Sequence, residues 1–200
     1  MSHYFESPPR GPDDPRLLTL QVQGRSLELR TGVGVFSRER IDHGTTVLLQ
    51  TVPAPPAEGN FLDLGCGYGP IALTMASLSP NATVWAVDVN DRARELAAGN
   101  AANAGLTNVH FSAPEEVPPA IRFSVIWSNP PIRIGKAALH NLLHQWLSRL
   151  ELSGEAFLVV QRHLGSDSLQ CWLTEQGWPT SRVASRRGFR VLRCQARSSC

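Results

Sequence analysis

Cysteine is scarce in this sequence, and long apolar stretches are missing. None of its four cysteines (Cys66, Cys171, Cys194 and Cys200) stands in a Cys-x-x-Cys pair or in a spacing typical of metal ligands. We therefore expect reduced thiols, no disulfide and no metal site. No segment reaches the roughly 18 uncharged apolar residues of a membrane span, and the proline-rich residues 1–16 lack the apolar stretch of a secretion signal. These absences predict a soluble, cytoplasmic protein.

Charge is also limited. Charged residues make up 18% of the chain and the formal net charge is +2, too small to indicate a nucleic-acid partner by itself. The distribution is uneven, because residues 178–200 contain no acid but include Arg182, Arg186, Arg187, Arg190, Arg193 and Arg197. Such a stretch can contact phosphates, or it can be a solvated strand edge that its charge protects against aggregation. Both interpretations stay open.

The order of expected elements indicates the fold class. A chain of 200 residues, 42% of them hydrophobic, is enough for one core and too short for a second domain of normal size. From residue 60 onward strand and helix patterns alternate, which predicts a parallel sheet with crossover helices on its faces. Strands are expected at 61–64, 83–88, 109–111, 123–127, 156–161, 180–184 and 189–195, and helices at 71–78, 92–104, 137–150 and 166–176. The sequence thus predicts a doubly wound, Rossmann-like α/β sheet, mostly parallel with an antiparallel C-terminal strand.

Residues 1–59 are predicted to form an extension packed on a domain of residues 60–200. Segments 17–23 and 25–30 alternate apolar and polar residues around Gly24, which is typical of a small antiparallel hairpin. Asp42 is placed to cap a short helix over 45–52, and prolines follow it.

A glycine-rich turn, Asp63-Leu64-Gly65-Cys66-Gly67-Tyr68-Gly69, follows the first strand of the alternating region. Glycine permits positive φ and has no β-carbon to block a ligand, so such a turn lets the backbone approach a nucleotide-like cofactor. The pattern alone is weak, since any tight strand-to-helix turn favours the same glycines. Asp88 strengthens it, because a carboxylate at the end of the next strand can accept both hydroxyls of a ribose.

A second motif, Asn129-Pro130-Pro131, follows the apolar segment 123–127. The two prolines make the loop rigid, so the Asn129 side-chain oxygen and the Pro130 carbonyl can act as fixed acceptors. Bonded to the hydrogens of an exocyclic amino group, they would turn its lone pair toward an electrophilic methyl group and stabilise the charge developing on nitrogen. Alone, the motif is better explained as a strand terminator. With the glycine turn upstream, it predicts methyl transfer by Asn129, Pro130 and Pro131.

This chemistry needs no general base, because the methylated, ammonium-like product is acidic enough to lose its proton to water. The histidines are therefore expected to be surface or packing residues. They include His110, His140, His144 and His163.

The glycine turn, together with Ala86-Val87-Asp88-Val89-Asn90, resembles the cofactor site of class I S-adenosylmethionine-dependent methyltransferases. Dinucleotide dehydrogenases usually lack the aspartate two residues before the first glycine. The resemblance implies S-adenosylmethionine as cofactor, with Gly65 and Gly67 near its amino-acid part, Asp63 on its ammonium and Asp88 on its ribose. Further cofactor contacts are expected at Cys66, Val89 and Asn129. One departure is the stretch Ser112-Ala113-Pro114, where such families often carry an acid for the adenine amino group and only Glu115 is near.

Other segments resemble the small-subunit ribosomal RNA guanine 2-amino methyltransferase family, in the same order along nearly the whole chain. They are His3-Tyr4-Phe5, Gly34-Val35-Phe36-Ser37, Asp42-x-Gly44-Thr45 with Leu48-Leu49, Asn129-Pro130-Pro131 with Gly135, and Gly188-Phe189-Arg190-Val191-Leu192. The resemblance implies methylation of guanine in ribosomal RNA. Members known for this activity have a duplicated, degenerate N-terminal half with no counterpart in this sequence, so the surface that positions RNA is expected to differ.

One of the residues expected to contact RNA is a second departure from the family pattern. Ile132 stands where the family commonly has an aromatic ring that stacks on the flipped base, and isoleucine offers dispersion without a π-face. Phe36 or Trp127 is a candidate to supply the ring, and Phe36 and Ile132 are expected to bind the substrate. Because an extruded base needs its flanking strand held, three arginines are expected to contact phosphates. These are Arg186, Arg187 and Arg190.

Two alternatives remain beside RNA methylation. Asn-Pro-Pro followed by an aromatic also serves methylation of a glutamine side-chain amide in proteins, and Ile132 argues mildly against that. The missing adenine-binding acid would suit a non-catalytic, cofactor-bound RNA-binding module. The intact Asn129-Pro130-Pro131 argues against such a loss of catalytic function.

Overall fold

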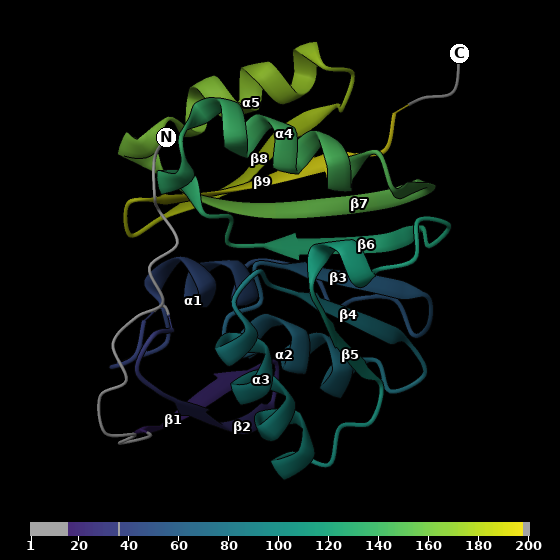
Figure 1. Cartoon of the computed structure of the whole chain (residues 1–200). Helices are drawn as coiled ribbons and strands as arrows, with labels where there is room; N and C mark the ends of the chain where they lie inside the picture. The colour runs from purple at the N-terminus through teal and green to yellow at the C-terminus, as the bar shows by residue number, and fades with distance from the viewer. Residues whose placement is uncertain (1–15, 36, 198–200) are drawn as a thin grey trace, which may run out of the picture.

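A seven-stranded sheet runs through the molecule (Figure 1), which we describe from a computed structural model over residues 16–35 and 37–197. Its strand order is β5-β4-β3-β6-β7-β9-β8. Neighbours from β5 to β7 pair in parallel, and β9 pairs antiparallel with both β7 and β8. The strands are β3 (Asn60–Leu64), β4 (Thr83–Val87), β5 (Val109–Ser112), β6 (Phe123–Ser128), β7 (Leu150–Gln161), β8 (Thr180–Arg186) and β9 (Phe189–Gln195). The predicted, mostly parallel Rossmann-like sheet with an antiparallel C-terminal strand is confirmed.

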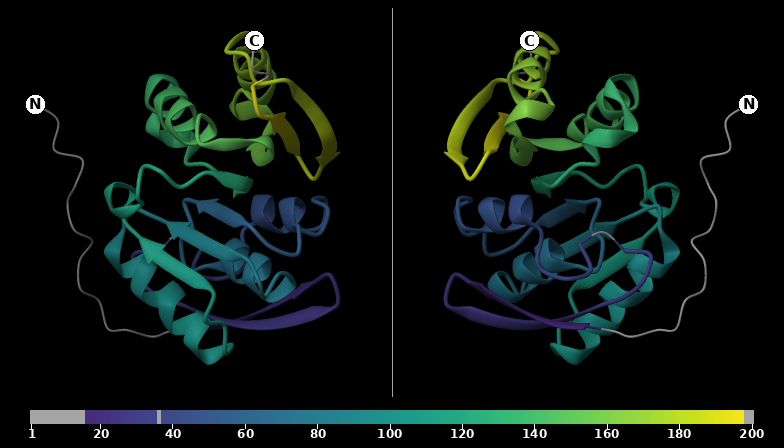
Figure 2. Two further views of the ribbon diagram at one scale, coloured as in Figure 1. Left: turned by 90° about the vertical axis from the view of Figure 1, so that its right-hand side faces the viewer. Right: turned by 90° about the vertical axis from the view of Figure 1, so that its left-hand side faces the viewer.

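Helices cover both faces of the sheet (Figures 1 and 2). The helices are α1 (His43–Leu49), α2 (Pro70–Leu78), α3 (Asp91–Asn103), α4 (Lys136–Leu147) and α5 (Ser166–Glu175). Side chains alternate across β6, so Val125 and Trp127 join a core beneath α1 and α2, whereas Ile126 joins a second core beneath α4 and α5. Phe123 also joins the second core, and the pairing of β6 with β7 shifts in register between Phe123 and Val125. Burying a side chain such as Phe123 stabilises the fold by about 1.5–3 kcal/mol.

The N-terminal hairpin, β1 (Arg16–Val22) and β2 (Arg25–Thr31), is present as predicted. Its apolar residues share a core with α1 and α2, and Leu29 is fully buried there. Asn100 of α3 joins it to the glycine turn, since its Nδ2 donates to the Arg30 carbonyl and to the Tyr68 carbonyl, both at 2.9 Å. The division into residues 1–59 and 60–200 stays a prediction.

Several element boundaries differ from the sequence-based predictions, most of all the start of β7, which begins at Leu150 rather than at Ala156. Helix α4 ends at Leu147 rather than Leu150, because Leu150 continues the apolar stripe of the helix but pairs with Phe123 at the start of β7. Helix α5 begins at Ser166 as predicted and ends at Glu175, and its N-cap is Gly165, in the left-handed region at φ 92°. Helix α1 covers His43–Leu49 rather than 45–52, and it begins directly after its predicted cap, Asp42.

No helix in residues 16–35 and 37–197 is long and apolar enough to cross a membrane. Within the same residues, no group of three or more His, Cys, Asp and Glu side chains is arranged to hold a metal ion.

Candidate functional site

Three neighbouring strands bring the two sequence motifs together at one edge of the sheet. Leu64, the last residue of β3, pairs with Val87 of β4 on one side and with Ser128 of β6 on the other. The glycine turn, Asp88 and Asn129 follow these strand ends directly, so all three lie at the same carboxyl edge. After β3 the chain adds β4 and β5 on one side of β3, and it then adds β6 and β7 on the other side. The direction in which strands are added therefore reverses between β3 and β6. Ligands of open α/β sheets bind at such a reversal.

The glycine turn leaves space where side chains would otherwise stand. Gly65 and Gly67 have φ of 80° and 54°, and a β-carbon built on either meets no atom within 4 Å. At Gly69 the same β-carbon would lie 2.7 Å from Leu73, so this third glycine serves the packing of α2 instead. The open backbone at Gly65 and Gly67 fits the close approach expected of a cofactor. Cys66 between them is buried. Burial, and to a smaller extent the negative charges of Asp63 and Asp88, raises the pKa of its thiol well above the ordinary value.

Asp63 offers a buried oxygen that has no protein partner. Its Oδ2 accepts the Ala72 N–H at 2.8 Å, whereas its Oδ1 is buried and makes no hydrogen bond with the described residues. The pKa of Asp63 is raised to about 8, mainly by burial and also by the charge of Asp88, although the hydrogen bond from the Ala72 N–H lowers it. An orphaned carboxylate oxygen beside the turn fits a cationic ligand group such as the ammonium of S-adenosylmethionine.

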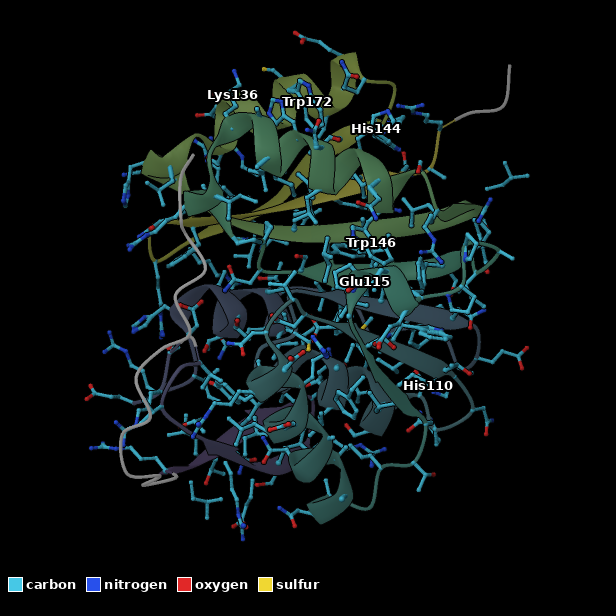
Figure 3. The ribbon with its side chains drawn as sticks, in the orientation of Figure 1. His110, Glu115, Lys136, His144, Trp146 and Trp172 are labelled. Atoms are coloured by element: carbon cyan, nitrogen blue, oxygen red, sulfur yellow. The ribbon has the colours of Figure 1, made fainter. Side chains whose placement is uncertain are left out.

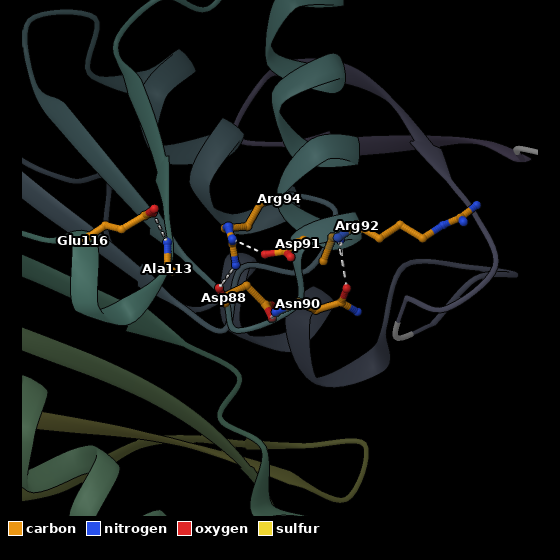
Figure 4. A network of polar contacts seen from close by, with 8 residues as sticks. Asp88, Asn90, Asp91, Arg92, Arg94, Ala113 and Glu116 are labelled. Carbon is orange, nitrogen blue, oxygen red and sulfur yellow. Dashed lines mark hydrogen bonds and ion pairs between the residues drawn. The ribbon is translucent and has the colours of Figure 1, made fainter. Parts of the chain in front are cut away.

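Asp88 is held by two backbone N–H groups at the end of β4. Its Oδ2 accepts from Gly67 and its Oδ1 from Asn90, both at 2.9 Å. Arg94 bonds the Asp88 carbonyl at 2.6 Å and also pairs with Asp91 (Figure 4). Each carboxylate oxygen keeps a second lone pair, so this fixed carboxylate can also accept ribose hydroxyls. The side chain of Val89 is 73% exposed beside it and offers an apolar surface to a bound base.

The region expected to meet adenine contains two glutamates with different roles. Glu116 accepts the Ala113 N–H at 2.7 Å through its Oε2 (Figure 4) and so caps the short 3₁₀ helix η1 (Pro114–Glu116). Glu115 is exposed in the same turn (Figure 3). Of the two, Glu115 is therefore the acid left for an adenine amino group.

The side chain of Asn129 is held in place by hydrogen bonds from its amide nitrogen. Its Nδ2 donates to Asp42 Oδ2 at 2.7 Å and to Thr45 Oγ1 at 3.2 Å. Its Oδ1 accepts no hydrogen bond from the described residues, so the acceptor predicted from the sequence is free. The sequence marks Asp42 as a helix cap and places Asp42 and Thr45 in a family-like segment. Sequence spacing does not show their contact with Asn129, because that contact joins positions more than 80 residues apart.

The two prolines fix the loop after Asn129. The Pro130 carbonyl accepts the Ile132 N–H at 2.8 Å, and its second lone pair remains for a ligand. Ile132 begins the 3₁₀ helix η2 (Ile132–Ile134), is half-buried against the core beneath α4, and lines a cavity of about 160 Å³ with Lys136 and His140. Trp127 is 1% exposed and belongs to the opposite core, so it offers no face to a base. Phe36 lies outside the described residues.

The predicted phosphate contacts divide into two groups. Arg186 and Arg187 are exposed at the turn between β8 and β9, whereas Arg190 is 12% exposed and pairs with Asp167 of α5. Their turn lies at the same carboxyl edge of the sheet as the acceptor loop, because Phe189 pairs with Gln161 at the end of β7. Phe189 also lies close to Gly44 at the start of α1, where a β-carbon would be 3.0 Å from its ring. Arg162, whose N–H donates to the Gly188 carbonyl at 2.7 Å, is exposed in the same place and was not among the predicted contacts.

Three histidines pack against tryptophans, as expected of packing residues. His110 stacks on Trp85 with ring centroids 4.9 Å apart, and His140 stacks on Trp172 at 3.7 Å. His144 on α4 meets the edge of Trp178 at 5.3 Å. Figure 3 shows His110 far from His144 and Trp172, which lie together over α4 and α5.

Comparisons with known proteins agree with this geometry. The chain is 33% identical over 196 residues to the uncharacterized protein YbxB of Bacillus subtilis, covering 96% of this chain and 98% of that one. It is 31% identical over 149 residues to ribosomal RNA small subunit methyltransferase C of Shewanella piezotolerans, covering 72% of this chain but 43% of the enzyme.

Among solved structures, the chain resembles the Thermus thermophilus 16S rRNA N2 G1207 methyltransferase in complex with AdoMet and guanosine. The TM-score is 0.78 at 23% identity, over 96% of this chain and 53% of that one. The chain therefore spans about half the length of the ribosomal RNA methyltransferases that it matches. Residues 26–193 match the family described as methyltransferase small domain. The chain belongs to this family of class I methyltransferases and uses S-adenosylmethionine as its cofactor.

Proposed function

We propose that this methyltransferase transfers a methyl group to the 2-amino group of a guanine in ribosomal RNA. The observation that carries the proposal is the unpaired Asn129 Oδ1 at the carboxyl edge of the sheet, beside the open backbone of Gly65 and Gly67. The relatives named as ribosomal RNA methyltransferases, and the matching structure in complex with AdoMet and guanosine, support this substrate class.

The reaction follows from the positions of the acceptors. When bound, S-adenosylmethionine supplies a methyl group on a sulfonium sulfur, and its S–C bond breaks as the new N–C bond forms. A guanine amino group is a poor nucleophile because its lone pair is delocalised into the ring. Asn129 Oδ1 and the Pro130 carbonyl each accept one hydrogen of that group, which directs the lone pair toward the methyl carbon. They also stabilise the positive charge on nitrogen, and the product then releases its proton to water.

The cofactor is held by the protein groups already described. Asp63 Oδ1 receives the ammonium, the backbone at Gly65 and Gly67 faces the amino-acid part, and Asp88 accepts the ribose hydroxyls. Val89 covers the base. Cys66 contributes through its backbone, since its thiol is buried and donates to the Gly67 carbonyl at 3.6 Å.

The RNA strand is held by exposed arginines at the same edge of the sheet as the acceptor loop. Arg186 ends β8, Arg187 lies in the turn after it, and Arg162 adds a third cation directly after β7. Phosphate contacts of this kind keep the flanking strand in place while the target base leaves the stack. We leave Arg190 out of this surface, because Asp167 already neutralises its charge.

The proposal is tested by incubating the purified protein with labelled S-adenosylmethionine and with ribosomal subunits, RNA or protein from a strain that lacks it. Nucleoside mass spectrometry should find a guanosine methylated at the 2-amino group that is missing from the deletion strain. Label in a protein glutamine instead would replace RNA methylation with the glutamine alternative. Cofactor binding without label in any fraction would indicate the non-catalytic module.

A further inference from the structure

The orientation of the Asn129 amide is decided by its neighbours and not by its own shape. The oxygen and nitrogen ends of an asparagine side chain have nearly the same size, so a half-turn exchanges donor for acceptor at little steric cost. The proposed reaction needs the oxygen to face the substrate. A flipped amide would present N–H donors to an amino group that needs acceptors.

Two acceptors hold the nitrogen end away from the substrate side. Asp42 Oδ2 lies 2.7 Å from Asn129 Nδ2, and Thr45 Oγ1 lies 3.2 Å from it. An ionised carboxylate only accepts hydrogen bonds, so the flipped amide would place an oxygen against an oxygen at Asp42. This contact therefore selects one of the two orientations.

Asp42 is itself held in place on two sides. As the N-cap of α1, its Oδ2 also accepts the Thr45 N–H at 3.0 Å. A β-carbon on Gly44 would lie 2.9 Å from Asp42 Oδ2 and 3.0 Å from the Phe189 ring, so the glycine allows α1 to pack closely against β9. The carboxylate is thus fixed by the helix before Asn129 bonds to it.

We propose that Asp42 is a positioning residue for methyl transfer, which fixes the Asn129 amide with its oxygen toward the substrate, and that Thr45 assists it. This inference rests on the proposed role of Asn129 but not on the identity of the substrate. It gives residues 1–59 a part in the reaction, because Asp42 and Thr45 precede the predicted 60–200 domain and reach Asn129 from outside it. The rigid Asn-Pro-Pro loop fixes the backbone, and the cap of α1 fixes the side chain.

The first test is Asp42→Ser, which keeps a good N-cap for α1 but has too short a side chain to reach Asn129. We expect kcat for methyl transfer to ribosomal RNA to fall about tenfold or more, since misplaced reacting groups are costly, while KM for S-adenosylmethionine stays within a few fold. Thr46→Ala is the matched control, because it also removes one side-chain hydrogen bond from the first turn of α1, that to the Asp42 carbonyl at 3.0 Å. A wild-type kcat in Asp42→Ser would overturn the proposal.

The second test exchanges the two groups. Asn129→Asp keeps an acceptor for the substrate but sets two carboxylates against each other, so activity should fall. Adding Asp42→Asn restores a donor and an acceptor across the contact, and should recover at least about tenfold of the lost kcat. If Asp42 only stabilised the fold, the double variant would be no better than Asn129→Asp, and that result would refute a positioning role.

The third test needs no substrate and separates this inference from the proposed function. In ¹⁵N-labelled protein the Asn129 side-chain N–H₂ signals, assigned by their loss in Asn129→Asp, should be protected from exchange with solvent. In Asp42→Ser they should exchange faster, with the unfolding temperature close to that of the wild type. Unchanged exchange would show that Asp42 does not hold the amide, whatever the substrate. Faster exchange would support the positioning contact even if guanine proved not to be methylated.

Discussion

Gly67 donates its N–H to Asp88 Oδ2 at 2.9 Å, and this hydrogen bond joins the glycine turn to the strand end 21 residues further along the chain. The contact fixes the carboxylate against the open backbone of the turn, so the groups assigned to the ribose and to the amino-acid part of the cofactor form one rigid unit. Asn90 holds the other oxygen of the same carboxylate. A cofactor thus meets acceptors whose positions are set before it binds.

Asp88→Ala should therefore weaken cofactor binding. Leaving a pair of ribose hydroxyls unsatisfied costs about 1–3 kcal/mol, which titration calorimetry with S-adenosylhomocysteine would measure. Asp91→Ala is a matched control, because it removes a nearby carboxylate that is 84% exposed and pairs with Arg94. NAD should not bind to the wild type. Equal affinity in the two variants would mean that Asp88 does not hold the ribose.

Asn129→Ala should lower turnover by about a hundredfold or more, because it removes an acceptor that acts on charge developing in the transition state. Cofactor affinity should stay within a few fold of the wild type. Asn141→Ala, an exposed asparagine on α4, provides the control for a simple asparagine truncation. The measurement is single-turnover methylation of ribosomal RNA. Unchanged turnover in Asn129→Ala would mean that the Asn-Pro-Pro loop only ends the strand and has no catalytic role.

The sequence predicted the parts of the site that are local, and it missed those that depend on distant contacts. The glycine turn, Asp88 and Asn129 follow strand ends that apolar patterns mark well, so their meeting at one edge of the sheet follows from parallel pairing. Burial of Trp127 and neutralisation of Arg190 by Asp167 depend on packing between elements that sequence spacing does not encode.

The N-terminal residues show the same limit. Asp42 has the local signature of a helix cap, and the structure confirms that role. Its bond to Asn129 spans 87 residues, and nothing in either motif indicates it. The predicted end of helix α4 at Leu150 was wrong for a related reason. An apolar stripe does not show whether its last leucine belongs to a helix or to the strand that follows.

Replacing Arg186 and Arg187 together by alanine should weaken RNA binding and flatten its dependence on salt by about two units of slope, because each lost phosphate contact removes about one released counterion. Cofactor affinity should not change. A control with the same loss of charge is Arg25→Ala with Arg122→Ala, since Arg25 is exposed in the hairpin and Arg122 precedes the amino end of β6. Binding titrations over a range of salt concentrations would compare them, and equal slopes for the two pairs would argue against a dedicated RNA surface.

The buried carboxyl of Asp63 predicts how stability depends on pH. Its pKa is raised from an ordinary 3.8 to about 8 in the folded chain, mainly by burial. Between these values the folded protein keeps a proton that the unfolded chain releases, so the free energy of unfolding should fall as pH rises from about 4 to about 8. Asp63→Asn mimics the protonated carboxyl and keeps an oxygen for the Ala72 N–H, so its stability should fall less steeply over that range.

The cofactor should reverse part of this dependence. An ammonium placed at Asp63 Oδ1 favours the ionised carboxylate, so binding of S-adenosylhomocysteine should release a proton near neutral pH, and less of one in Asp63→Asn. Calorimetric titrations in buffers of different ionisation enthalpy would count the protons, and thermal unfolding across the pH range would measure the stability of the cofactor-free protein. Identical pH slopes in the wild type and Asp63→Asn would contradict the raised pKa. A steeper wild-type slope without proton release on binding would place the ammonium elsewhere.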